Sequence, residues 1–444
     1  MKKILLTLSV LLILAFGILA KYLIDRSIIF TGFAAKNVAS GVFIAHRTQE
    51  SIEQNDIHFF PVTLASTKVD SINKTVTSDF FSFGKQTAIY REGLGVCLLS
   101  NFDKKEILKQ KLNLPQAPNL QNIKWPKGEK IENDLSEIFD KDSIEKTLNW
   151  ALSEGNTRAV LIAYDTLGII EKYNNGFDKN SLLLGWSITK SIFNALSGIL
   201  VKENRLQLDS SVAISDWEND TRKNISLRSL LTMSSGLEWE ENYGDISDVT
   251  LMLYREGNKA NYAIQKKSLY PIDSIWQYSS GTSNILSKVI RKQFKTNQAY
   301  WSFPYKKLFY RIGMYHTTIE ADASGHFVAS SYSYATTRDW ARFGLLYLNN
   351  GIWGKDTILS SDWIQFTRSE APHSEGKYGA QFWLNKSGYE LPNAPKDIFY
   401  ADGYQGQRIY IIPSKKLVIV RFGISKKGEF DYDKLVVSVI NALK

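Results

Sequence analysis

Cysteine is almost absent from this sequence, with Cys97 alone among 444 residues. One cysteine excludes a disulfide framework and a multi-cysteine metal site within one chain. We expect Cys97 to be a small buried side chain. The chain also has no HExxH motif, no paired Cys/His cluster and no EF-hand loop. We therefore expect neither a metal nor a cofactor.

Runs of like charge, internal repeats and low-complexity tracts are also missing. The chain has 54 Lys and Arg against 45 Asp and Glu, a net charge of +9. The basic residues are scattered and no basic-aromatic motif occurs, so we expect a solvated basic surface and no nucleic-acid partner. With 44% apolar and 22% charged residues, the composition is globular, and the length allows two or three domains.

The N-terminus is the one long apolar run. Lys2 and Lys3 precede the uncharged stretch Ile4–Ala20, a pattern typical of export. Its 17 residues are at the lower edge of what spans a bilayer, about 17–25. Cleavage at the end of the run is disfavoured by bulky Ile18 at the −3 position, and the alternative is an uncleaved single-pass anchor. Either way we expect the bulk of the chain in the periplasm or on the extracytoplasmic face of the membrane.

Three segments follow from this pattern. Residues 1–26 are a signal peptide or membrane anchor, residues 27–130 an accessory region, and residues 131–444 the main domain. The accessory region has short alternating runs such as Gly41–Ala45 and Ala88–Tyr90, which favour strands and loops from Ser27 onward. The proline-containing stretch Leu112–Lys130 is typical of a linker.

The main domain begins and ends with strand patterns. The first predicted hairpin pairs Ala159–Tyr164 with Ile169–Tyr173, and the second pairs Arg408–Ile412 with Leu417–Phe422. A helix is predicted over Asp142–Leu152. Another follows Asp431 at the C-terminus, with its apolar stripe at Leu435, Val436, Val439, Ile440 and Leu443. Helices between two terminal hairpins indicate an α+β domain in which both hairpins share one sheet.

The candidate nucleophile is Ser187, at the start of an apolar helical pattern that continues to Val201. Lys190 lies one turn further on the same face. A serine hydroxyl is a poor nucleophile until a neighbouring base removes its proton. The positive end of the helix dipole also favours a developing oxyanion.

Lysine can act as this base only if it is enclosed. Its free pKa is about 10.4, so a neutral amine near pH 7 costs roughly 4–5 kcal/mol, which burial reduces. The Ser-x-x-Lys pattern also recurs incidentally, at Ser71–Lys74, Ser82–Lys85, Ser143–Lys146 and Ser374–Lys377. On spacing alone a helix-cap serine with a snorkelling lysine is the better interpretation of residues 187 and 190.

Two further motifs change that balance. Trp276–Asn284 reads as a loop entering a helix, and its Tyr278 can relay a proton if a nearby cation lowers the phenol pKa. Tyr400–Gln407 precedes a strand, and its glycines allow a backbone N–H to approach a ligand. Taken singly, the first motif is explained by a tyrosine that packs its ring at the surface. The second is explained by a turn that glycine makes easier to form.

In this order the three motifs resemble the serine β-lactamase and penicillin-binding-protein superfamily. More closely, the chain resembles class C β-lactamase-related hydrolases, which include esterases and aminohexanoate-dimer hydrolases. The segments Ile225–Leu237, Asp339–Gly344 and Gly403–Gln407 are also similar to this subgroup. The resemblance covers residues from about 140 to 444. It implies an antiparallel sheet flanked by helices, with an all-helical subdomain that carries the nucleophile helix.

The resemblance also implies roles for individual residues. Ser187 would be acylated, Lys190 would be its base, and Tyr278 would shuttle protons. The N–H groups of Ser187 and Tyr404 would form the oxyanion hole. Ser280, Asp402 and Gly403 would bind substrate.

Two departures bear on the substrate. The penicillin-recognising members carry Lys-Thr-Gly where this chain has Ala401, Asp402 and Gly403, and usually Asn at the position of Ser280. An acid in place of a cation disfavours the carboxylate of a β-lactam. We therefore expect cleavage of a small-molecule ester or amide that has an uncharged or cationic group where a β-lactam has its carboxylate.

Other functions stay open. A β-lactamase or DD-peptidase is one alternative, and a non-catalytic membrane-anchored sensor with the same fold is another. A Ser–His–Asp hydrolase is a third, although the segment after Gly185 lacks the closing glycine of a nucleophile elbow. The five histidines are in no recognisable catalytic context, and are His46, His58, His316, His326 and His373.

Overall fold

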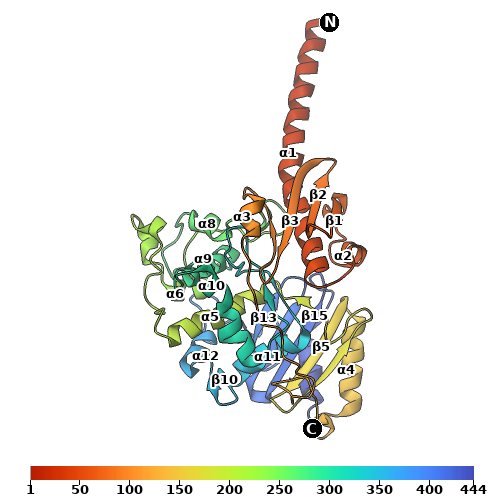
Figure 1. Cartoon of the computed structure of the whole chain (residues 1–444), viewed down its shortest axis with the longest axis vertical. Coiled ribbons are helices and arrows are strands. Elements are labelled where there is room, and N and C mark those ends of the chain that lie inside the picture. Colours follow the sequence, from red (N-terminus) through yellow and green to blue (C-terminus); the bar gives the residue numbers. More distant parts are fainter. Residues whose placement is uncertain (1) are drawn as a thin grey trace.

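A computed structural model describes residues 2–444, with side chains described for residues 7–18 and 20–444 (Figure 1). The side chains of Lys2 and Lys3 lie outside the described part. Helix α1 (Lys2–Phe43) projects from the molecule with its first half and enters it with its second. Among the described residues, its stretch Thr7–Phe43 is the one helix long and apolar enough to cross a membrane.

The second half of α1 overturns one prediction. Strands and loops were expected from Ser27 onward, including Gly41–Ala45, but the chain stays helical to Phe43. Small side chains let this part of the helix lie close against a sheet, and the fully buried ones are Ala34, Ala35, Val38 and Ala39. Packing therefore determines this helix, because local alternation alone favours a strand.

A four-stranded antiparallel sheet lies along α1. Its order is β1 (Ser66–Asp70), β2 (Thr75–Phe80), β3 (Phe83–Arg91) and β4 (Gly95–Leu98). The strand predicted at Ala88–Tyr90 is confirmed as part of β3. Two short helices flank the sheet, α2 (Gln49–Asn55) and α3 (Lys104–Leu108). Residues 109–134, which include the predicted linker, contain no helix or strand.

The central sheet is antiparallel and joins the two ends of the main domain. Its order is β12 (Trp383–Leu384), β13 (Phe399–Gly403), β14 (Gln407–Ile412), β15 (Leu417–Gly423), β5 (Thr157–Tyr164) and β6 (Gly168–Tyr173). Both predicted hairpins are confirmed, and so is the shared sheet, because β15 pairs with β5.

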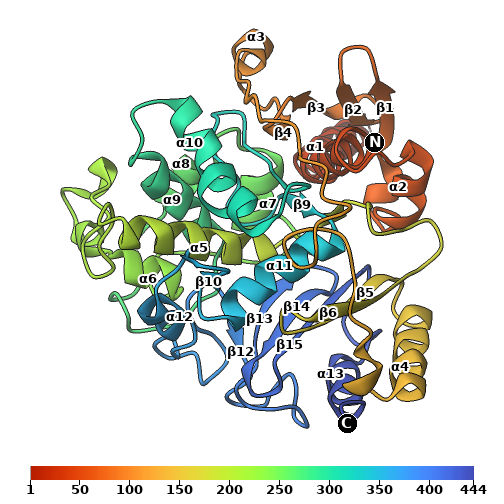
Figure 2. The same ribbon diagram turned by 60° about the horizontal axis from the view of Figure 1, so that its bottom comes forward.

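Helices cover both faces of this sheet (Figure 2). On one face α11 (Thr337–Leu348) packs against alternate residues, among them Leu161 and Val420. On the other face α4 (Lys141–Ser153) and α13 (Tyr432–Asn441) cover the intervening ones, such as Ile162 and Ile419. The predicted helices near both ends are thus confirmed, and Asp431 caps α13 as expected.

A mostly helical region stands beside α11 and contains the predicted nucleophile helix. Its helices are α5 (Ile188–Lys202), α6 (Leu227–Leu231), α7 (Asp248–Tyr254), α8 (Lys259–Ile264), α9 (Ser280–Arg291), α10 (Asn297–Pro304) and α12 (Ser361–Thr367). Short antiparallel pairings complete it, formed by β7 (Leu183–Leu184), β8 (Thr318–Ile319), β9 (Ser333–Ala335), β10 (Ile352–Trp353) and β11 (Asp356–Thr357). The predicted fold class is therefore confirmed.

A buried ion pair joins α1 to the segment between β8 and β9. The Lys36 ammonium donates to Glu320, and both side chains are almost fully buried. Ser40 and the backbone N–H of Val96 also donate to Glu320, at 3.0 and 2.8 Å. Lys36 lies 3.8 Å from the centre of the Tyr332 ring. The accessory region is therefore attached to the main domain by an ion pair that is shielded from water.

Removing one partner of this pair should be costly. We expect Lys36→Met to lower the free energy of unfolding by about 3–5 kcal/mol, because Glu320 would stay buried without a cation. The matched control is Lys109→Met, whose ion pair with Glu106 is largely exposed and should contribute less than about 1 kcal/mol. Urea unfolding of the full-length protein measures both. Equal losses would contradict a special role for the buried pair.

Candidate active site

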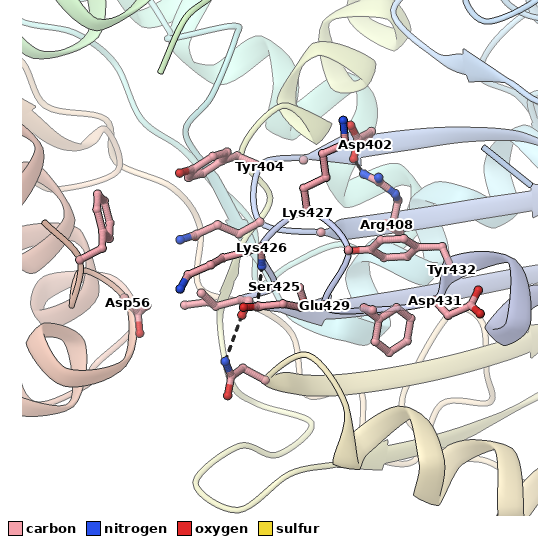
Figure 3. Close-up of a pocket in the computed structure, with 18 of the residues that line it drawn as sticks. Asp56, Asp402, Tyr404, Arg408, Ser425, Lys426, Lys427, Glu429, Asp431 and Tyr432 are labelled. Atoms are coloured by element: carbon pink, nitrogen blue, oxygen red, sulfur yellow. Dashed lines mark hydrogen bonds and ion pairs between the residues drawn. The ribbon is translucent and has the colours of Figure 1, made fainter. Parts of the chain in front are cut away.

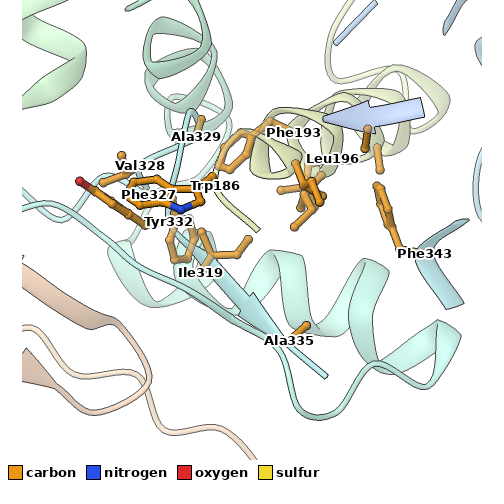
Figure 4. Close-up of a cluster of buried hydrophobic side chains, with 14 of the residues drawn as sticks. Trp186, Phe193, Leu196, Ile319, Phe327, Val328, Ala329, Tyr332, Ala335 and Phe343 are labelled. Carbon is orange, nitrogen blue, oxygen red and sulfur yellow. The ribbon is translucent and has the colours of Figure 1, made fainter. Parts of the chain in front are cut away.

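A tight turn presents Ser187 at the start of α5. Trp186 has a φ of +47°, an unusual conformation for a bulky residue. The turn is held by the Gly185 N–H, which donates to the Ser333 carbonyl at 2.8 Å. Trp186 packs among buried apolar side chains that include Phe193 of α5 (Figure 4). Ser187 occupies the N-cap position, but its side chain makes no capping hydrogen bond. The helix-cap interpretation is therefore wrong.

Lys190 is enclosed beside this serine. Only 1% of the residue is exposed, so its amine does not snorkel to water. Nζ lies 2.9 Å from Ser187 Oγ, 3.1 Å from Ser280 Oγ and 3.1 Å from the Ser330 carbonyl oxygen. Burial lowers the pKa of Lys190 to about 8, although the Glu241 carboxylate acts in the opposite direction. A substantial fraction of the amine is therefore neutral near pH 7–8.

Tyr278 completes this cluster from the loop before α9. The centre of its ring lies 4.7 Å from Lys190 Nζ, and it packs against Tyr378 and Trp383. Burial raises the pKa of the Tyr278 phenol well above its usual value, and a hydrogen bond with Ser187 only partly opposes this. The condition set for a proton relay, a phenol pKa lowered by a nearby cation, is therefore not met. Tyr278 is a neutral phenol that can donate a proton.

Glu241 is a site residue that the sequence did not reveal. It accepts hydrogen bonds from Ser280 Oγ at 2.6 Å, from the Ser280 N–H at 2.9 Å and from the Tyr243 hydroxyl at 2.7 Å. Ser280 is fully buried and links Glu241 to Lys190. The predicted contact of Ser280 with substrate stays a prediction, because the Ser280 hydroxyl is hydrogen-bonded to Lys190 and Glu241. The only sequence signal for Glu241 is its position four residues after the Leu237 motif.

The strand edge lies directly against the nucleophile turn. An ideal Cβ on Gly403 would lie 2.2 Å from the Gly185 carbonyl oxygen, so no side chain fits there. The next residue, Tyr404, contacts Trp186 edge to face at 5.6 Å and stacks on Tyr243 at 5.4 Å. Glycine therefore allows the strand edge to lie close to the nucleophile turn, and the predicted approach of a backbone N–H to a ligand stays a prediction. The oxyanion role of the Ser187 and Tyr404 N–H groups stays a prediction.

Asp402 is not a free carboxylate. Across β13 and β14 it stands opposite Arg408, and the two side chains form an ion pair. Its charge is thus largely compensated, so its repulsion of an anionic substrate is weaker than the sequence alone suggests. The pair also leaves Arg408 engaged, so it does not replace the lysine of Lys-Thr-Gly.

A polar cavity of about 1100 Å³ opens beside this strand edge (Figure 3). Asp402, Tyr404 and Arg408 line it, together with Lys426 and Lys427 from the segment after β15. Its charges are of both signs, so its shape and hydrogen bonding, rather than one dominant charge, would select a ligand.

The histidines do not reproduce a catalytic triad with Ser187. The nearest approach to one is at His326, where Ser324 Oγ lies 2.8 Å from the ring Nδ1 and donates to Asp322 at 2.6 Å. There the serine stands between the acid and the histidine, whereas a triad has the histidine in the middle. Ser187 has Lys190 as its partner instead.

Comparison with known proteins agrees with this geometry. The model of the Beta-lactamase family matches residues 159–438, more than half of the chain. A 6-aminohexanoate-dimer hydrolase of Paenarthrobacter ureafaciens is 22% identical over 302 residues, which are 62% of this chain and 74% of the relative.

Two solved structures share the fold. A Bacillus anthracis protein proposed to be a 6-aminohexanoate-dimer hydrolase has a TM-score of 0.55 at 22% identity, over 75% of this chain and 87% of its own. A family VIII carboxylesterase has a TM-score of 0.54 at 14% identity, over 68% and 97%. The chain belongs to the Beta-lactamase family, whose hydrolytic members attack through a serine.

Proposed function

We propose that this protein is an exported serine hydrolase that cleaves an ester or an amide through an acyl-enzyme on Ser187. The observation that carries the proposal is the buried amine of Lys190, 2.9 Å from Ser187 Oγ. The unbroken course of α1 from its apolar half into the core supports retention as a single-pass anchor. Residues 131–444 would then be the hydrolase domain, and residues 27–130 an accessory region that joins it to the anchor.

Acylation would begin with neutral Lys190. Its Nζ accepts the Ser187 proton while Oγ bonds to the substrate carbonyl carbon. The negative charge moves to the carbonyl oxygen, where the N–H groups of Ser187 and Tyr404 would hold it. The C–O or C–N bond then breaks, Tyr278 gives its phenol proton to the leaving group, and the Lys190 ammonium restores that proton.

Deacylation would use the same groups in reverse order. Water attacks the acyl carbon, and its proton passes through Tyr278 to Lys190. When the bond to Oγ breaks, the proton returns to Ser187 and the acid leaves. Ser280 and Glu241 touch no reacting atom in this scheme. They hold the amine in place and set its pKa.

The substrate class follows from the strand edge. Ala401 cannot supply the cation of Lys-Thr-Gly, and Arg408 is paired with Asp402. A substrate carboxylate beside Ala401 would therefore find no unpaired cation to bind. This favours an ester or amide over a β-lactam or peptidoglycan as the substrate. The names of the relatives, a dimer hydrolase and a carboxylesterase, support both linkages.

Ser187→Ala should abolish covalent labelling by a fluorophosphonate and lower ester hydrolysis by at least about 10³-fold. The matched control is Ser143→Ala, at an exposed Ser-x-x-Lys of α4, which should behave as wild type. Labelling followed by mass spectrometry, with a panel of short acyl esters, amides and a chromogenic cephalosporin, measures this.

The outcomes separate the alternatives. Turnover that persists in Ser187→Ala would point to a histidine triad. A wild-type protein that no acylating probe labels would be a non-catalytic sensor, and preferential cephalosporin turnover would indicate a β-lactamase.

The pH profile should follow the protonation of Lys190. Because only the neutral amine accepts a proton, kcat/KM should rise with pH and level off above about 8. The Glu241 charge favours the ammonium, so Glu241→Gln should lower the pKa and move this limb to lower pH. Rates from pH 5.5 to 9.5 (about four units around that pKa) test it. A profile that falls with pH, or that Glu241→Gln moves upward, would contradict Lys190 as the base.

A further inference from the structure

An apolar cavity of about 510 Å³ lies between α1 and the hydrolase domain, separate from the polar cavity. Its volume is within the range of about 300–1,000 Å³ that encloses small organic ligands. We propose that it holds the acyl chain of an amphiphilic ester or amide that reaches the site from the membrane. This inference rests on the proposed function and names its substrate class.

The walls of the cavity are mostly apolar and continuous with α1, and the two charged residues in them, Arg26 and Asp245, are paired with each other at 2.9 Å. Along α1 they extend from Tyr22 to Phe33, a rise of about 16 Å. Phe59 and Val62 close the cavity from the segment after α2, and Ile246 closes it from the hydrolase domain. A flexible hydrocarbon is the ligand that gains most from such walls, because it removes apolar surface from water without unpaired polar groups.

The inner end of the cavity lies next to the candidate catalytic cluster, although Ser187, Lys190 and Tyr278 do not themselves line it. Trp186, which precedes Ser187, lines it together with Tyr243 and Tyr404. The Tyr243 hydroxyl lies 3.4 Å from Ser280 Oγ, and the Tyr404 N–H is the predicted oxyanion donor. An acyl chain of the substrate bound in this cavity would therefore have its carbonyl end beside Ser187.

The outer end faces the side from which the anchor emerges. Tyr22 and Leu23 line it within one turn of the apolar run and are 50% and 44% exposed. Phe60 and Leu64, at its rim, are 80% and 46% exposed. Exposed aromatic side chains next to a membrane-spanning helix are typical of the lipid–water interface.

The β2–β3 hairpin extends this apolar rim. Its Phe81 and Phe83 are 79% and 55% exposed. The Gly84 carbonyl accepts a hydrogen bond from the Thr31 hydroxyl of α1 at 2.6 Å, which places the turn beside the helix where it leaves the domain (Figure 1). Apolar side chains gathered there would lie in the bilayer surface if α1 spans it.

The polar cavity lies on the other side of Tyr404, which lines both cavities. A substrate with an apolar chain in one and a polar head in the other would place the bond between them at the predicted oxyanion hole. Two cavities of opposite character that share Phe59 and Tyr404 therefore favour an amphiphile over a uniformly polar substrate.

The test compares two esters on the full-length protein in phosphatidylcholine nanodiscs. We expect p-nitrophenyl dodecanoate to be cleaved with a higher kcat/KM than p-nitrophenyl butyrate, each corrected for Ser187→Ala. Ile246→Trp fills the cavity and should lower this dodecanoate-to-butyrate ratio by about tenfold or more. The matched control is Ile352→Trp, at a 48% exposed isoleucine of β10 away from α1, which should leave the ratio unchanged.

A second variant keeps the test decisive if Ile246→Trp does not fold. Phe60→Ser alters an 80% exposed side chain at the rim and should lower the ratio by about threefold. If neither variant changes the ratio while fluorophosphonate still labels Ser187, the acyl-chain site is wrong and the hydrolase remains. If wild type cleaves neither ester and takes no label, the proposed function itself fails.

Discussion

The free energy needed to keep an amine uncharged beside Ser187 is the constraint on which the site depends. At the ordinary lysine pKa of 10.5, deprotonating the side chain at pH 7 costs about 5 kcal/mol, and at a pKa of about 8 it costs about 1.4 kcal/mol. Three elements provide the enclosure. Helix α5 carries Lys190, α9 contributes Ser280, and the segment between β8 and β9 contributes the Ser330 carbonyl. Glu241 limits the effect, because its charge favours the ammonium. The resulting pKa would keep the amine usable as a base near neutrality, while Nζ still has three hydrogen-bond partners.

The sequence predicted the fold best where a repeating pattern matched the observed packing. The central hairpins were recognised because β-branched residues alternate or run continuously there, and both faces of their sheet are in fact covered. The second half of α1 was missed for the opposite reason. Its alanines, such as Ala35 and Ala39, favour a helix, but the nearby Val38 and Gly41 weaken that preference in a short window. The four-stranded sheet that packs against the helix is distant in sequence. No local pattern carries that information.

The candidate site shows the same division between local and distant determinants. Ser187 and Lys190 are one helical turn apart, so their spacing allowed the contact that the structure contains, and the two further motifs favoured it over a helix cap. Glu241 and Ser330 reach the amine only through the fold, and neither belongs to a motif that was recognised. The direction of the Tyr278 pKa shift could not be decided from the sequence, because a sequence shows possible cations but not the desolvation, and desolvation is the larger effect.

Helix α1 contacts the segment between β8 and β9, which in turn contacts the candidate active site. Lys36 of α1 holds Glu320 at one end of the segment that supplies Ser330, and it lies over the ring of Tyr332 near the other end. The same helix forms one wall of the apolar cavity. Any displacement of α1 would thus change both the shape of that cavity and the position of the carbonyl that binds Lys190. Since a lost hydrogen bond to the ammonium lowers its pKa further, the position of α1 and the pKa of Lys190 would be linked through a few buried contacts.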